Sequence, residues 1–243
     1  VEAGVVAESA LRDRALAISL YQQAEENGSG HDAARQGIVR LMLADPDATQ
    51  GAKAHTMTAL QAHGAQRAAH HWAAAANLTR PEEAAEQLVQ ALEHDPFSWV
   101  VLWDLDRLYR LQGRWEELAA IWDTAGHVAE HSAGFIACCR RSAALHEGPL
   151  SQPERALERY RQILARDAKD ATSRWGVQRT LAAMGKDEEL VVALADEAKA
   201  CSDPRRAAQL WNFCGNLWLG RDEKQAAACF SRTLEVAPTD VQA

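Results

Sequence analysis

Four segments of sixteen residues repeat along this chain of 243 residues and align with one another without a gap. In each segment a small residue is followed four positions later by a large residue, and then after four more by an aliphatic one. That spacing places all three side chains on one face of a helix, where the small one admits a close neighbour. The segments are therefore predicted to be packed helices, ended in three cases by Pro46, Pro96 and Pro238. They are HDAARQGIVRLMLADP (31–46), PEEAAEQLVQALEHDP (81–96), PERALERYRQILARDA (153–168) and EKQAAACFSRTLEVAP (223–238).

The composition agrees with an all-α fold. The chain holds 49 alanines among 243 residues, and Val and Ile are sparse. Alanine is the strongest helix former, whereas the scarce β-branched residues are those that favour strands. No run of eighteen apolar residues occurs, which excludes a transmembrane helix. The formal net charge of −8 argues against nucleic acid as a partner, because phosphate binding needs a basic surface.

Glycines mark a second kind of turn between these segments. Gly64, Gly113 and Gly185 each follow a helical run, where a left-handed residue allows a tight helix–helix turn. Only seventeen residues separate Gly64 from Pro81, about one helix fewer than the spacing elsewhere. We therefore expect the helix within residues 65–80 to be shared between two pairs, with altered geometry at residues 63–82. This divides the chain into N-terminal repeats (1–80) and a C-terminal array (81–243).

In these residues the chain resembles the tetratricopeptide repeat family over about residues 8–238. The large and small residues of one helix pair fall at the family's spacings, and so do those of the last repeat. Asp106 and Gln178 depart from the pattern, since a small residue is usual there. The resemblance implies a right-handed α-solenoid of about six antiparallel helix pairs. The matching residues are Leu105, Tyr109, Gly113, Leu118, Trp122 and Ala125, then Trp211, Gly215, Trp218, Ala226, Phe230 and Pro238.

The resemblance implies a non-enzymatic scaffold or adaptor that holds a partner protein or peptide in a concave groove, without a cofactor. In the family, the groove residues come from the first helix of each pair and lie off the packing stripe. Carried over one residue at a time, the candidate partner-binding residues are Trp103, Arg107, Arg110, Arg140, Arg141, Trp175, Arg179, Asn212 and Asn216.

Arginine beside tryptophan suits a partner's carboxylates, so the expected partner is acidic. The alternative, equally consistent with the sequence, is that these arginines form solvated ion pairs with acidic residues of the chain itself and bind no partner. Asn212 and Asn216 match asparagines with which family members hold an extended peptide. The lysine that accompanies them in those members is absent, since Asn212 stands in its place.

Two other functions compete with the scaffold. The first is a sensor whose groove binds a peptide or a metabolite. The second is a zinc-dependent hydrolase, because His127, Glu130 and His131 form an H-x-x-E-H sequence. That sequence falls at the expected end of a repeat helix, where solvated polar residues are common, so no metal site and no catalytic residue is assigned. A cluster of His55, His63, His70 and His71 is interpreted as solvent-facing.

The sequence also predicts which tryptophans and cysteines are buried. Trp72, Trp122, Trp211 and Trp218 are predicted to fill the core, whereas Trp103 and Trp175 lie off their packing stripes. Cys214 and Cys229 are predicted to be reduced and poorly accessible, and the five cysteines lack metal-ligand spacing. Reduced thiols and the lack of a visible secretory signal favour a cytoplasmic protein. Exposed solenoid ends would allow an end-to-end homodimer.

Overall fold

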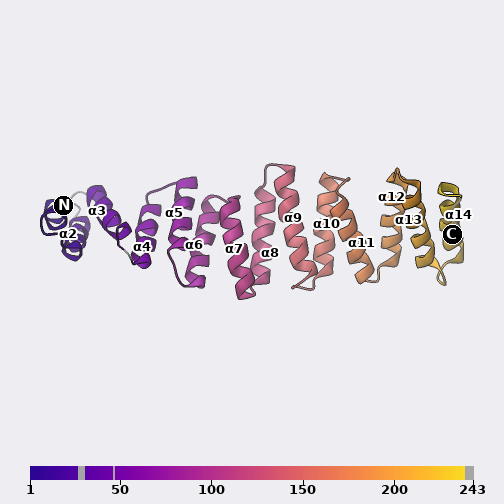
Figure 1. Cartoon of the computed structure of the whole chain (residues 1–243), viewed down its shortest axis with the longest axis horizontal. Helices are drawn as coiled ribbons and strands as arrows, with labels where there is room; N and C mark the ends of the chain where they lie inside the picture. The colour runs from indigo at the N-terminus through magenta and orange to yellow at the C-terminus, as the bar shows by residue number, and fades with distance from the viewer. Residues whose placement is uncertain (27–30, 46, 239–243) are drawn as a thin grey trace. The chain divides into compact units, whose positions relative to one another are not determined.

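The computed structural model describes residues 1–26, 31–45 and 47–238, which form helices joined by short turns, with no β-strand in those ranges (Figure 1). Pro46 and the residues after Pro238 lie outside the described residues. The helices are α1 (Glu2–Ser9), α2 (Arg14–Glu26), α3 (His31–Leu43), α4 (Ala48–Ala59), α5 (Gly64–Ala76), α6 (Pro81–His94), α7 (Trp99–Gln112), α8 (Trp115–Val128), α9 (Ser132–Glu147), α10 (Pro153–Arg166), α11 (Ala171–Ala183), α12 (Asp187–Ala200), α13 (Pro204–Trp218) and α14 (Glu223–Val236).

Local sequence explains where these helices begin and end. Proline is the first residue of α6, α10 and α13, where its missing N–H costs no hydrogen bond. The Asp170 side chain accepts a hydrogen bond from the Ser173 N–H and so caps the start of α11. Gly113 ends α7 with a φ of 69°, and Gly185 lies between α11 and α12 with a φ of 66°. Both are left-handed conformations, as the sequence predicts for these turns.

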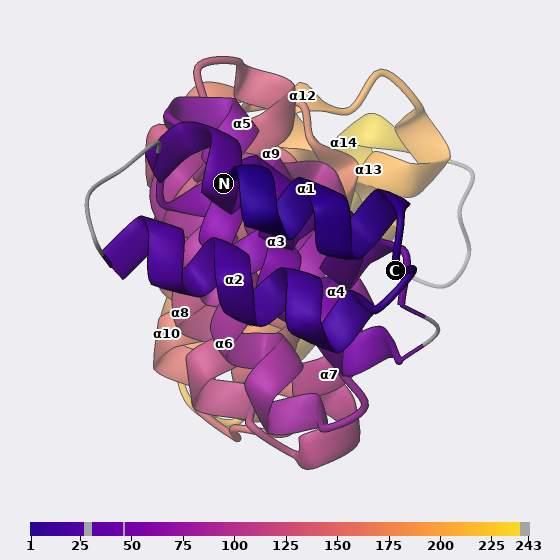
Figure 2. The ribbon, with the colours of Figure 1, turned by 90° about the vertical axis from the view of Figure 1, so that its left-hand side faces the viewer.

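The chain divides into two compact units, Val1–Val128 and Ala129–Ala243. Inside each unit, a helix packs against its neighbours in chain order, and α1 also contacts α3. Figure 2 shows α1 and α2 lying side by side at the start of the first unit. The boundary proposed from the sequence, at residues 80 and 81, falls inside the first unit, and the domain division at that point stays a prediction.

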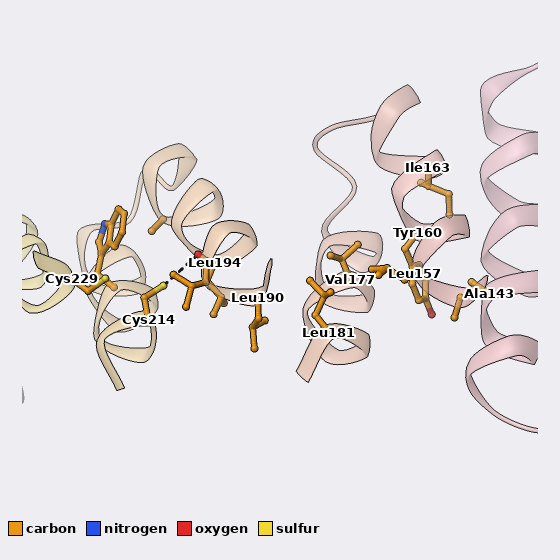
Figure 3. Packing of buried hydrophobic residues seen from close by; sticks show 14 of the residues in the cluster. Ala143, Leu157, Tyr160, Ile163, Val177, Leu181, Leu190, Leu194, Cys214 and Cys229 are labelled. Carbon is orange, nitrogen blue, oxygen red and sulfur yellow. Dashed lines mark hydrogen bonds between the residues drawn. The ribbon is translucent and has the colours of Figure 1, made fainter. Parts of the chain in front are cut away.

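Each unit has its own hydrophobic core. In the first unit, Tyr21, Ile38 and Ala54 belong to a buried cluster built from α1 to α4. In the second, the cluster extends from Cys139 of α9 to Cys229 of α14. Figure 3 shows the α10 side chains Leu157 and Tyr160 lying between α9 and α11. Alternating small and large side chains let neighbouring helices approach closely, as the repeat pattern predicts.

One three-residue contact occurs in both units with identical spacing. In the first unit, the Tyr21 hydroxyl donates to Glu8, and Arg40 donates to the same carboxylate. In the second unit, Tyr160 and Arg179 bind Glu147 in the same way. The tyrosine follows the glutamate by 13 residues and the arginine follows it by 32 in both cases. Helices α1, α2 and α3 therefore correspond to α9, α10 and α11.

This correspondence corrects the repeat register expected from the sequence. The segment alignment placed α3 with α6, α10 and α14, but the contacts match α3 to α11 and match α2 to α10. Pairing in that register gives α1–α2, α3–α4, α5–α6 and α7–α8 in the first unit, and three pairs in the second. The described helices thus form seven pairs rather than about six, and α5 and α6 form an ordinary pair. No helix is missing near residues 65–80, so none needs to be shared between two pairs.

Candidate functional site

In the first unit, the sequence-predicted site residues lie on α7. The Trp103 side chain is 49% exposed, and its edge contacts the buried Trp122 ring at 6.3 Å between ring centroids. Arg107 follows one turn later, is exposed, and forms no ion pair with any described residue. Val100 and Leu111 extend this exposed stripe of α7 at its two ends. The stripe is apolar for much of its length and contributes little to the core.

Arg110, the third predicted residue of α7, is occupied inside the chain. Its Nε atom donates to Asp106 Oδ2 at 2.5 Å, and its Nη2 atom donates to Oδ1 at 3.1 Å. Asp106 is buried and also accepts a hydrogen bond from the Trp122 indole N–H at 2.9 Å. This explains why a carboxylate stands where a small residue is usual, because two donors satisfy it inside the helix pair. Arg110 therefore orders Asp106 and is only partly available to a partner.

In the second unit, Arg140 of α9 bonds Asp170 at the start of α11 at 2.7 Å. Burial by itself would raise the pKa of Asp170, but its hydrogen bonds with Ser173 and the charge of Arg140 lower that pKa below its ordinary value. Arg141 is half-buried beside it. These contacts join α9 to α11, and Arg140 itself is half-buried.

Trp175 and Arg179 form the best-defined part of the candidate site. The Trp175 side chain is 59% exposed, and the Arg179 guanidinium lies 4.0 Å from its ring centroid. Arg179 also donates to both carboxylate oxygens of Glu147, and Glu147 accepts the Tyr160 hydroxyl at 3.0 Å. Burial would raise the pKa of Glu147, yet these two donors lower it, and burial raises the pKa of Tyr160 to about 12. Glu147 is thus an anion that fixes Arg179, and Arg179 in turn holds Trp175 in place.

The last predicted pair lies on α13. Asn216 donates from its side-chain nitrogen to Asn212 Oδ1 at 2.9 Å, so the two amides face one another one turn apart. Asn216 is exposed and Asn212 is half-buried. Gln178, the second departure from the small-residue pattern, donates to Glu197 of α12 at 2.6 Å. Within the second unit, the predicted residues therefore come from α9, α11 and α13, the first helices of their pairs.

A further surface in the first unit was not predicted from the sequence. Trp72 of α5, expected in the core, has a side chain that is 38% exposed, and its indole N–H donates to Asp104 of α7 at 2.8 Å. Beside it lies a cavity of about 180 Å³ between α5 and α7. Its lining residues are Ala65, Ala68, Ala69, Trp72, Asp95, Ser98, Val100 and Val101. The alanines of α5 leave this space because their side chains are too short to fill it. The alanine-rich sequence GAQRAAHHWAAAA was the signal that could have predicted it.

The other tryptophans predicted in the core have two outcomes. Trp122 and Trp211 are buried, as predicted, and Trp218 is half-buried.

The histidine candidates do not assemble a metal centre in the part of the chain that the structure describes. His127 lies in the last turn of α8, whereas His131 precedes the first residue of α9, so the H-x-x-E-H sequence does not lie on one helix. His55 and His70 meet across α4 and α5, with ring centroids 5.8 Å apart. Among the described residues, no group of three or more metal-ligating side chains comes together. None of the described helices is long and apolar enough to span a bilayer.

The cysteines lie in the second unit as free thiols. Cys214 and Cys229 are buried, which confirms their predicted poor accessibility, and the Cys214 thiol contacts the Val191 carbonyl oxygen at 3.8 Å (Figure 3). Burial raises the pKa of Cys214 to about 12 and that of Cys138 to about 11. Cys201 is half-buried in a turn. A raised pKa keeps a thiol protonated and unreactive at neutral pH.

The fold and these surfaces define an all-α repeat protein built from antiparallel helix pairs. No protein-family model matches the chain, and no curated protein matches it. Among solved structures, the chain is similar to YrrB, described as a tetratricopeptide repeat protein with an unusual peptide-binding site, at 17% identity. That match covers 78% of this chain and 95% of YrrB, with a TM-score of 0.42.

Two further similarities have the same character. A fragment of MamA from Desulfovibrio magneticus RS-1 is 16% identical, with 78% of this chain and 97% of that chain covered and a TM-score of 0.39. PilF from Pseudomonas aeruginosa is 16% identical, with 93% and 92% covered and a TM-score of 0.38. The similarities extend over most of the chain. The fold is therefore described from the helix pairs of the structure and not from these similarities.

Proposed function

We propose that this protein is a non-enzymatic scaffold that holds a segment of a partner protein on the exposed faces of its first helices. The observation that carries the proposal is the exposure of Trp103 and Trp175, each on a first helix and each about half exposed. A half-exposed indole ring leaves apolar area in water, and burying such area is what tryptophan contributes at protein interfaces. The proposed binding residues are Trp103, Arg107 and Arg110 in the first unit, and Arg140, Arg141, Trp175, Arg179, Asn212 and Asn216 in the second.

An acidic partner has less support than the sequence suggested. Arg110, Arg140 and Arg179 each bind a carboxylate of the chain itself, so their charges are largely compensated before any partner arrives. Arg107 is the predicted arginine whose charge stays uncompensated by the described residues. We therefore propose that tryptophan area and the amides of Asn212 and Asn216 supply most of the binding free energy, while the arginines mainly orient these groups. A regulatory sensor that binds a peptide is the second candidate function, and the same face would serve it.

The experiment is selection of a random peptide library against the whole chain, followed by affinity measurements on the enriched peptides. Trp103→Ala or Trp175→Ala should weaken binding by roughly tenfold or more, the loss typical of an interface hot spot. Val192→Ala is the matched control, because Val192 of α12 is also exposed and lies on a second helix. If no peptide is enriched, or if binding survives both tryptophan substitutions unchanged, the proposal is wrong.

A further inference from the structure

The two units carry very different charge. Residues 1–128 hold 10 Lys and Arg against 18 Asp and Glu, whereas residues 129–243 hold 16 of each kind. The whole formal charge of −8 therefore belongs to the first unit, and the second is neutral. A surface of one sign attracts partners of the opposite sign and raises their rate of association. The first unit is the one that should recruit a basic partner.

Within that acidic unit, the surface around Trp72 joins charge to apolar area. Asp95 lines the cavity between α5 and α7 and pairs with no cation among the described residues. Asp104 is bound by the Trp72 indole N–H through Oδ2, and it too forms no ion pair in the described chain. Val100, 55% exposed, continues the apolar surface along α7. Two carboxylates without an ion pair among the described residues thus lie beside an indole ring and a cavity of about 180 Å³.

We infer that this surface, defined by Trp72, Asp95, Val100 and Asp104, binds a partner segment in which Lys or Arg flanks an apolar side chain. The apolar side chain would enter the cavity against the alanines of α5. The neighbouring cation would lie against Asp95 or Asp104, and the Trp72 face would add a cation–π contact. Arg107 lies about two turns beyond Val100 on α7, away from Asp95 and the cavity. It is one turn from Asp104 but forms no ion pair with it in the described chain. The inference rests on the proposed scaffold function and adds the chemistry of one partner.

The test uses the whole chain and two labelled synthetic peptides that differ only in charge. Both carry a central leucine, flanked by lysines in one peptide and by glutamates in the other, and fluorescence anisotropy gives their dissociation constants at low and high salt. The lysine peptide should bind more tightly, and its affinity should fall as salt rises. Asp95→Asn with Asp104→Asn should weaken it by roughly three- to tenfold, the range expected for two exposed ion pairs. The amide introduced by Asp104→Asn would keep an oxygen for the Trp72 indole N–H, so this variant should retain the fold.

A control variant separates this site from the general charge of the unit. Glu86→Gln with Glu116→Gln removes the same charge from exposed positions on α6 and α8 and should leave the affinity nearly unchanged. Equal weakening by both double variants would mean that only net charge acts, and the inference would be wrong. Tighter binding of the glutamate peptide, or no binding of either peptide, would overturn it too. Library peptides that still depend on Trp103 or Trp175 would in that case leave the proposed scaffold function standing.

Discussion

Arg179 and Glu147 join α11 to α9 through two parallel hydrogen bonds, each 2.5 Å long, from Nε and Nη2 to the two carboxylate oxygens. The pair is partly buried, and the Tyr160 hydroxyl supplies a third donor to the same carboxylate. Bidentate arginine–carboxylate pairs are among the stronger polar contacts in proteins. Their recurrence as Arg40 and Glu8 in the first unit makes this contact a structural element of the repeat.

Replacing Glu147 with alanine should destabilise the second unit. The substitution leaves the Tyr160 hydroxyl and the Arg179 guanidinium without their acceptor in a partly buried place, which costs about 1–3 kcal/mol. Urea denaturation monitored by circular dichroism measures the change. Glu235→Ala is the control, because Glu235 is exposed on α14 and should lose less than about 0.5 kcal/mol. Equal stability of the two variants would contradict this account of the contact.

Gly176 should tolerate no side chain while Tyr160 is present. A Cβ atom placed there would lie 2.7 Å from the Tyr160 ring, which real structures essentially never show. Gly176→Ala should therefore destabilise the protein by about 1–3 kcal/mol through overpacking, although alanine is the better helix former. Combining it with Tyr160→Leu should cost less than the sum of the two single changes, since the space is shared. Strict additivity in this double-mutant cycle would show that the ring is not what excludes the side chain.

Acid should destabilise the first unit through His55. Burial, with a smaller contribution from the charge of His70, lowers the pKa of His55 below its ordinary value of 6.5. The unfolded chain then takes up this proton at a higher pH than the folded chain does. The contribution of neutral His55 to the free energy of unfolding is therefore fully present above pH 6.5, and it is lost as the pH falls below that value. His55→Asn should flatten the dependence of the urea midpoint between about pH 7 and pH 5. An unchanged slope in this variant would contradict the role given to His55.

Thiol labelling should distinguish Cys201 from the other cysteines. Cys201 is half-buried in a turn, while Cys138, Cys139, Cys214 and Cys229 are buried. A bulky thiol reagent in native buffer should modify one thiol quickly and the rest only as the helices open. Cys201→Ser should remove the fast phase. Fast labelling of Cys214 and Cys229 in that variant would contradict their burial.

The helices themselves could be predicted from the sequence because their causes are local. The small and large columns, the prolines that begin α6 and α10, and the left-handed Gly113 and Gly185 depend only on neighbouring residues. The same periodicity indicated that Trp103 and Trp175 lie off the packing stripes, and both are exposed. A helix face can be read from spacing alone, since about 3.6 residues per turn fixes which side chains share it.

The tertiary structure determined which residues of different helices contact one another. The contact between Arg40 and Glu8 spans 32 residues, so no local pattern revealed that α3 corresponds to α11. Arg140 and Arg179 proved to be paired, because the carboxylates that compensate them come from other helices and approach only once those helices have packed. The Arg110 pair with Asp106 lies one turn apart on α7 and is local. Trp72, predicted in the core, is exposed, and its indole N–H bonds Asp104 of α7, 32 residues further along the chain. The sequence determined each helix and its apolar face. Packing determined which helices form pairs and which arginines bind carboxylates of other helices. Both depend on contacts between residues that are distant along the chain.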